Sequence, residues 1–182
     1  GKLMPAHNLP LFATWTANTY TLTFDPGDYG EVTTQAQVYD QPIYQFPPSP
    51  TNDMFKFLGW YDGDGIKMQP GVLYQKASDQ TFEGHWELKK TFNPDWIICN
   101  ANQTSDYNKQ VQAVSFSMAS GYESLKSSIV VEYKQQGADT WTSSKPFNAG
   151  GYDVKFTRPS DGNYLDMGEK VVSGAVIIKR IP

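Results

Sequence analysis

The chain has 182 residues, which is enough for one large or two small domains. Its 15 lysine and arginine residues against 19 aspartate and glutamate residues give a net charge of -4 without any basic block, which argues against nucleic acid as a partner. No stretch approaches the roughly 18 consecutive apolar residues of a membrane-spanning helix, so the chain is not expected to be embedded in a membrane. Aromatic residues make up 14% of the chain, and this share, with frequent threonine and valine, favours a mainly β fold.

Residues 1–16 are interpreted as the remnant of a preceding repeat. Residues 5–15 align without a gap with residues 76–86, and both segments end in a tryptophan. A single terminal strand cannot bury its apolar face alone, so we expect this remnant to lie over the first module or to be mobile. Gly1 directly before Lys2 resembles the residue left by removal of a tag, and we therefore expect a monomeric fragment of a longer chain.

Strand signals recur at short intervals along the rest of the chain. Tyr20 to Phe24 alternates between apolar and polar residues, as a half-buried strand does. β-Branched and aromatic runs of the same kind follow at residues 129–133, 152–156 and 175–178. Turn-forming sequences separate the strands at residues 25–28, 62–65, 136–139 and 160–163. Helix is nearly absent, and the best candidate is a short one at residues 119–126.

One segment cannot contribute a central strand. Residues 43–52 follow Pro42 and contain three further prolines, each of which lacks the amide donor that a sheet ladder needs. We expect this segment to be a long ordered connection inside the first module. A boundary between two modules is expected near residues 89–93, where a strand-like run gives way to charged residues and then to Asn93-Pro94. So short a joint predicts limited bending.

The first module carries an ordered set of aromatic and glycine motifs. From residue 20 onwards the chain reads Y-T-L-T-F-D-P-G, then a proline-rich link, then F-L-G-W-Y-D-G-D-G, and it closes with T-F-E-G-H-W. In this order residues 17–89 resemble the internalin B-repeat, or Listeria-Bacteroides repeat, of long bacterial surface proteins, which implies a compact β-grasp-like module. Residues 26–30 replace the Asn-Gly-Gly that usually follows Phe-Asp in that family, which alters the first hairpin. The positions that carry the resemblance are Phe24, Asp25, Gly59, Trp60, Tyr61 and Trp86.

The second module carries a different signature. Tyr107-Asn108-Lys109 stands where a group of bacterial surface domains has Y-[DN]-G, and residues 146–154 read P-F-N-A-G-G-Y-D-V. Residues 106–181 therefore resemble the MBG/YDG group of bacterial immunoglobulin-like surface domains, which implies an immunoglobulin-like β-sandwich over residues 93–182. The lysine in place of glycine departs from the opening turn of that group.

Two packing expectations follow from these motifs. Tyr152, Val154 and Phe156 alternate along a strand, so their side chains are expected on one face, toward the core. Gly59 precedes Trp60, and a glycine there is expected to leave space for a bulky ring beside a neighbouring backbone.

No group of residues matches a catalytic, cofactor or metal site. Residues 62–65, D-G-D-G, are too few for a calcium loop of the EF-hand type and are interpreted as a hairpin turn. His7 and His85 have no second histidine or cysteine at metal-ligand spacing, and His85 is expected to point to solvent. Cys99 is the only cysteine, and we expect it to be a small apolar packing residue.

Aromatic side chains are the main candidates for binding, because rings on β modules can stack against sugars. Three of the five tryptophans, Trp15, Trp60 and Trp86, are accounted for by the repeat resemblance. Trp96 and Trp141 remain as candidates for a ligand surface or an intermodule contact.

These patterns predict non-catalytic repeat modules of a secreted bacterial cell-surface protein, located outside the cell and using no cofactor. Three functions remain open. The modules can serve as spacer or adhesive units, bind a host or bacterial surface glycan or protein, or form the accessory region of a secreted hydrolase. A groove with two or more exposed rings would favour glycan binding, whereas a catalytic domain in the flanking sequence would favour the accessory role.

Overall fold

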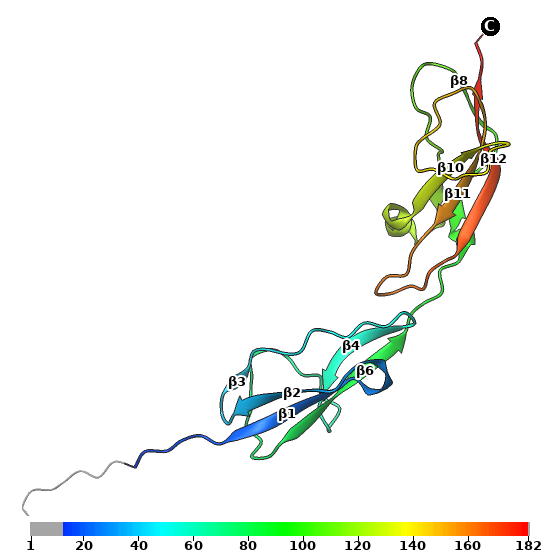
Figure 1. Ribbon diagram of the computed structural model, residues 1–182. Helices are drawn as coiled ribbons and strands as arrows, with labels where there is room; N and C mark the ends of the chain where they lie inside the picture. Colours follow the sequence, from blue (N-terminus) through cyan, green and yellow to red (C-terminus); the bar gives the residue numbers. More distant parts are fainter. Residues whose placement is uncertain (1–12, 182) are drawn as a thin grey trace, which may run out of the picture. The chain divides into compact units, whose positions relative to one another are not determined.

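The computed structural model describes residues 13–181, drawn in colour in Figure 1. The chain divides into two compact units, with the division between Glu87 and Leu88. Strands dominate both units, which confirms the predicted mainly β fold.

Some of the sequence predictions fall outside these residues or are not tested by them. The predicted repeat remnant, residues 1–16, lies mostly outside the described residues, and His7 lies wholly outside them. Residues 13–16, the part of the remnant that is described, are exposed and form no strand. The module ends expected at residues 89 and 93 stay predictions.

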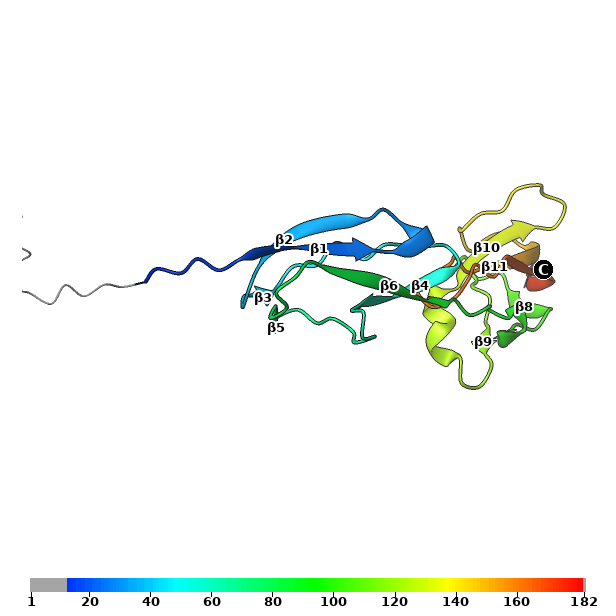
Figure 2. The ribbon, with the colours of Figure 1, turned by 90° about the horizontal axis from the view of Figure 1, so that it is seen from below.

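The first unit contains a mixed four-stranded sheet and a second, two-stranded sheet formed by β3 and β5. The order in the larger sheet is β2-β1-β6-β4, with β1 antiparallel to β2 and parallel to β6. Figures 1 and 2 show β1 and β6, the first and last strands of the unit, side by side. A hairpin with the last strand inserted beside the first agrees with the predicted β-grasp-like module. The elements are β1 (Thr19–Asp25), the 3-10 helix η1 (Gly27–Tyr29), β2 (Thr33–Val38), β3 (Pro42–Ile43), β4 (Phe55–Tyr61), β5 (Val72–Leu73) and β6 (Gln80–Leu88).

The core of the first unit is built from aromatic rings. Apolar and polar residues alternate in β1, and this alternation buries Leu22 and Phe24 completely. The ring of Phe24 lies 5.8, 5.3 and 5.4 Å from the rings of Phe46, Trp60 and Phe82, centroid to centroid. Tilted and edge-on contacts of this kind stabilise a core beyond the burial of apolar area. Phe24 is therefore the centre of this cluster.

Trp86 joins the last strand of the unit to its first hairpin. Its indole N–H donates to the carbonyl oxygen of Pro26 at 3.1 Å, and its ring packs against the ring of Tyr29. Gly84 permits this approach, because a Cβ at Gly84 would lie 3.0 Å from the Cα of Pro26. The altered hairpin is in this way held against the sheet.

Gly59 has a role different from the expected one. A Cβ at this position would meet the side chain of Lys67, whose Cε would lie 2.5 Å away, and not an aromatic ring. The backbone φ at Gly59 is 135°, a conformation that residues with a Cβ rarely adopt. Trp60 itself turns to the core, where it is buried against Phe24 and Phe57. Position 59 thus requires glycine for two reasons: the backbone has a positive φ, and the side chain of Lys67 occupies the space that a Cβ would need.

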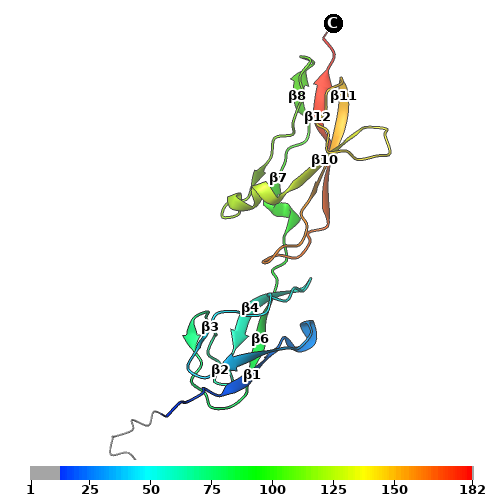
Figure 3. The ribbon, with the colours of Figure 1, turned by 60° about the vertical axis from the view of Figure 1, so that its left-hand side comes forward.

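The second unit contains a four-stranded sheet of order β10-β11-β12-β8 and a two-stranded sheet of β7 and β9. β10, β11 and β12 form an antiparallel meander, and β8 pairs in parallel with β12 (Figure 3). This agrees with the predicted immunoglobulin-like fold, whose second sheet is here two strands wide. The elements are the 3-10 helix η2 (Pro94–Trp96), β7 (Ile97–Ile98), β8 (Gln103–Asp106), β9 (Ser117–Met118), the 3-10 helix η3 (Glu123–Ser128), β10 (Val130–Gln135), β11 (Gly150–Thr157) and β12 (Glu169–Lys179).

The core of the second unit follows the predicted alternation. Tyr152, Val154 and Phe156 are 7%, 0% and 0% exposed, so all three face the interior as expected. Cys99 packs against this core in a half-buried position, and burial raises the pKa of its thiol. Its predicted role as a packing residue is confirmed.

Asp153 lies where the pairing register between β11 and β12 shifts. Its carboxylate accepts a hydrogen bond from the backbone N–H of Gly174 at 2.9 Å and another from the hydroxyl of Ser173 at 3.0 Å. The bond from Gly174 is the main cause that lowers the pKa of Asp153, and the bond from Ser173 adds to it. The side chain thereby ties the irregular part of β12 to β11.

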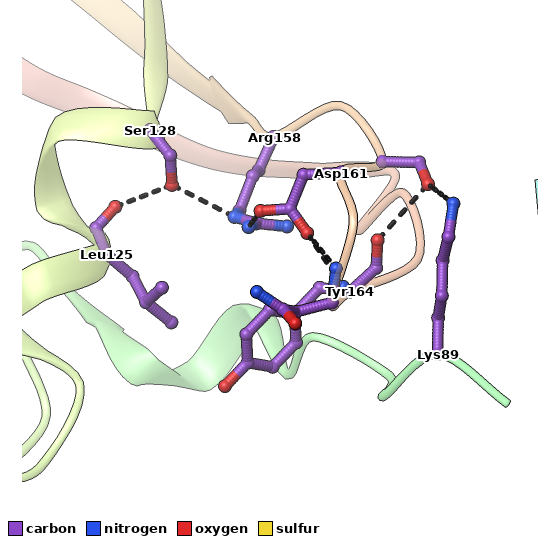
Figure 4. A network of polar contacts seen from close by, with 8 residues as sticks. Lys89, Leu125, Ser128, Arg158, Asp161 and Tyr164 are labelled. Carbon is purple, nitrogen blue, oxygen red and sulfur yellow. Dashed lines mark hydrogen bonds and ion pairs between the residues drawn. The ribbon is translucent and has the colours of Figure 1, made fainter. Parts of the chain in front are cut away.

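Arg158 is a charged side chain buried inside the second unit, with 1% of its surface exposed. Its guanidinium carbon lies 5.3 Å from the ring centroid of Phe92 and 4.9 Å from that of Tyr164. Its Nε donates to the hydroxyl of Ser128 at 2.9 Å, and its Nη2 forms an ion pair with the carboxylate of Asp161 (Figure 4). The buried charge is therefore paired and covered by two aromatic faces, which is how such a charge is tolerated.

The loop fixed by Arg158 also holds the first residues of the second unit. The backbone N–H of Lys90 donates to the carbonyl of Asn163 at 2.9 Å, and the N–H of Leu165 donates back to the carbonyl of Lys90 at 2.9 Å. The ammonium of Lys89 donates to the hydroxyl of Ser160 at 3.1 Å (Figure 4). The chain is thus bonded into the second unit from Lys89 onwards.

Phe24→Ala is expected to destabilise the first unit alone. Removing a fully buried ring from a packed core costs about 3–5 kcal/mol, and the two cores are separate clusters. Denaturant unfolding followed by two-dimensional NMR should show an earlier midpoint for the first unit only. Phe156→Ala is the matched control and should affect the second unit only. A joint loss of both units in either variant would show that the cores are coupled.

Acid should weaken the second unit through Asp153. The pKa of this carboxyl in the folded state lies below its ordinary value of 3.8, so the charged form stabilises the fold above about pH 4 and this contribution is lost as the pH falls through the folded pKa. Asp153→Asn keeps a hydrogen-bond acceptor and cannot titrate. Between about pH 5 and pH 2.5 the urea midpoint of the variant should therefore fall less than that of the wild type, whereas parallel curves would refute the role of Asp153.

Candidate functional site

The loop at residues 62–65 turns its carboxylate onto its own backbone. Asp62 Oδ1 accepts hydrogen bonds from the N–H groups of Asp64 at 3.0 Å and Ile66 at 2.8 Å. These bonds define a turn stabilised by an aspartate side chain, and they confirm the predicted hairpin turn. Across residues 13–181 no three histidine, cysteine, aspartate or glutamate side chains are grouped closely enough to hold a metal ion.

His85 lies on the exposed side of β6, as expected. Its ring stacks on that of Tyr61 with 3.9 Å between centroids and 13° between planes. This contact joins β6 to its neighbour β4 across the surface of the sheet.

Trp96 is surrounded by other rings of the second unit. It stacks on Tyr122 with 3.8 Å between centroids and meets Phe92 edge-on at 5.0 Å. It also packs against the buried core of the unit. One face of the Trp96 ring is therefore occupied by Tyr122, which leaves less of it for a ligand.

Trp141 lies on the face of the main sheet of the second unit that points away from the core. Its neighbour Thr142 pairs with Tyr133, whose side chain enters the core. Because side chains alternate along extended backbone, Trp141 faces away from that core. There the ammonium groups of Lys134 and Lys155 lie 5.1 and 5.0 Å from its ring centroid.

The charges around Trp141 are partly compensated. Lys155 forms an ion pair of 2.8 Å with Glu132 on the neighbouring strand. The indole N–H of Trp141 donates to no other residue of the described chain. The half-buried ring thus combines a π surface with two flanking lysines. Lys155 is paired with Glu132, and Lys134 lies opposite Asp153 on β11, where its charge helps to lower the pKa of that carboxyl. The sequence identified the tryptophan, but not the lysines that flank it.

Both units also have hollows that the sequence did not predict, including an open one of about 350 Å³ beside Gln35 and Tyr44 in the first unit. A second hollow of the first unit has a volume of about 260 Å³ and an apolar floor that includes Ile43, Tyr74 and Phe82. Its rim carries Lys67 and Lys76. Residues from five separate segments meet here, and for this reason no local motif announces it.

The hollow of the second unit is more polar. It has a volume of about 320 Å³ and lies beside Tyr133 and Tyr152, with Thr140, Phe147 and Asn148 among its other lining residues. The hydroxyl of Tyr152 donates to the carbonyl of Asn148 at 2.9 Å. This tyrosine therefore secures the loop that forms one wall.

Comparison with known proteins gives several relatives of this chain, among them two bacterial proteins. The chain is 36% identical to internalin H of Listeria monocytogenes over 94 residues, which is 50% of the chain and 17% of internalin H. It is 23% identical over 162 residues to a protein of Evansella cellulosilytica named as a membrane protein, which is 80% of the chain and 24% of that protein. The chain thus spans less than a quarter of the length of these curated relatives. No family model matches it, and no solved structure matches it.

These similarities bear on the resemblances in the sequence. The match to internalin H supports an internalin-type bacterial surface repeat within the chain. The MBG/YDG resemblance of residues 106–181 stays a prediction. None of the helices in residues 13–181 is long and apolar enough to cross a membrane.

Proposed function

We propose that the two units are non-catalytic modules of a secreted bacterial cell-surface protein and that they act as spacers. The similarity to internalin H supports the surface setting. The roles of individual polar side chains support the rest: Asp62 shapes a turn, Asp153 secures a strand and Asp161 pairs with a buried arginine. Groups that could take part in chemistry are used here to hold backbone in place.

The observation that carries the proposal is the short connection between the hydrogen-bonded structures of the two units. β6 continues to Leu88, and Lys90 already pairs with Tyr164. Only Lys89 lies between them, and its side chain is bonded to Ser160. A connection this short adds little length of its own, which suits a spacer whose length is supplied by the modules.

A module exchange on bacterial cells tests the spacer role. Residues 17–182 are deleted from the parent surface protein, or replaced by unrelated β modules of the same length, and an epitope tag is placed before them. Antibody binding to the tag on intact cells should fall on deletion and return on replacement, because a spacer is defined by length and not by its surface. Failure of the replacement to restore binding, with equal amounts of protein at the surface, would contradict the proposal.

Binding of an acidic glycan at Trp141 is the second candidate function, and the lysines flanking its ring favour it. The same cells can test it on immobilised acidic glycans. Trp141→Ala should then reduce attachment on the order of tenfold, the equivalent of about 1.4 kcal/mol. Trp15→Ala, which alters a tryptophan that is 90% exposed and belongs to no sheet, is the control. Equal attachment of both variants and the wild type would contradict glycan binding at Trp141 and leave the spacer role as the remaining proposal.

A further inference from the structure

We propose that each unit is a clamp against tension along the chain, an inference that rests on the spacer function and deepens it. A surface protein that is bound at one end and anchored at the other transmits pulling force through every module between. The pairing of the terminal strands decides how a module answers that force.

In the first unit the terminal strands are direct neighbours and run in parallel. Four residue pairs form their ladder, from Leu22 opposite Gln80 to Asp25 opposite Glu83. Force on the two chain ends pulls β1 toward its amino end and β6 toward its carboxyl end. Because the strands are parallel, these pulls are opposed along the ladder and load its hydrogen bonds together, in shear.

An antiparallel terminal pair would respond differently. Its two pulled ends would lie at the same end of the ladder, so force would separate one hydrogen bond after another. Opening bonds in sequence requires less force than breaking several at once, although the total number of bonds is the same. The topology of the first unit therefore selects the stronger geometry.

Buried rings cover the ladder of the first unit. Phe24 and Phe82 are paired across it, they are 0% and 2% exposed, and their ring centroids lie 5.4 Å apart. Leu22, at the other end, is also fully buried. Water is thus kept from one face of the ladder, where it would replace strand hydrogen bonds as they stretch.

The second unit has a related arrangement, in which the last strand pairs with the second strand, because the first strand, β7, pairs with β9 in another sheet. β8 and β12 pair in parallel over four residue pairs, from Gln103 opposite Val176 to Asp106 opposite Lys179, and they lie side by side in Figure 3. Gln103 is fixed in addition by two bonds to Ser115, at 2.7 Å from its amide nitrogen and 2.7 Å to its amide oxygen. The last strand is again locked to an early one.

A further parallel contact protects the start of the second unit. Lys90 bridges in parallel to Tyr164, five residues before β12 begins. The loop that supplies Tyr164 is secured by Arg158 through Asp161, which accepts the N–H of Tyr164 at 2.8 Å (Figure 4). Force that arrives at Lys90 therefore meets a buried, ion-paired anchor before it reaches β8.

Single-molecule force spectroscopy on the full chain tests the clamp. The protein, with Cys99→Ser, is pulled either through its two termini or through its amino terminus and a cysteine introduced as Gln41→Cys. The second geometry peels β2 from β1, which are antiparallel. Terminal pulling should require a several-fold higher force for the first unit than peeling does. The contour length released identifies the unit, because Thr19–Leu88 is shorter than Lys90–Lys179.

Two matched variants locate the resistance. Asp79 accepts the N–H of Thr21 at 2.8 Å beside the first pair of the ladder, whereas Asn52 accepts the N–H of Met54 at 2.8 Å and that of Phe55 outside it. Asp79→Ala should lower the force of terminal pulling more than Asn52→Ala, at similar loss of equilibrium stability.

Equal forces in the two pulling geometries, or equal effects of the two variants, would overturn the clamp. The force is measured on purified protein and the module exchange on cells. If the units unfold at low force while unrelated modules of the same length restore antibody binding, the clamp is refuted and the spacer role stands. If the units resist force but unrelated modules fail to restore binding, the spacer role is refuted.

Discussion

Parallel pairing between an early strand and the last strand is the interaction on which both units depend. In the first unit it places Phe24 opposite Phe82, and the remaining rings of the core gather around this pair. In the second it places β12 between β11 and β8. These partners lie far apart in the sequence, so their pairing carries a large entropic cost and forms only together with the core that it organises. The other strands add to a sheet whose centre is already defined.

Much of the fold could be predicted from local patterns. The alternation of Tyr152, Val154 and Phe156 was enough to assign their buried face, and the D-G-D-G sequence was enough to assign a turn. Both features depend on neighbours within a few residues. Gly59 shows where such reasoning ends, because the reason for glycine is Lys67, which lies across a hairpin and cannot be identified from the residues around Gly59.

The environment of the candidate site could be predicted only in part. Trp96 and Trp141 are equivalent in the sequence, yet one stacks on Tyr122 within the packing of its unit and the other lies between two lysines on an outer face. Arg158 had no signal at all, since its partners come from three separate segments. Side chains brought together by tertiary structure are not recorded in any local pattern.

A common theme links the two units. Carboxylates cap turns or fix irregular strands, a buried guanidinium secures the residues that begin the second unit, and rings fill the interior. In both units polar side chains hold the backbone in place around an apolar interior, which is the basis of the proposed clamp. The internalin-type similarity supports a bacterial surface repeat as their setting.

Native-state hydrogen exchange tests the central role of the parallel ladders most directly. Amides of β1 and β6 should exchange only when the first unit unfolds globally, and those of β12 only when the second does, while the edge strand β2 should exchange through smaller openings. Protection of the β1–β2 hairpin during local opening of β6 would contradict this view, since the last strand would then be an addition to the fold and not its centre.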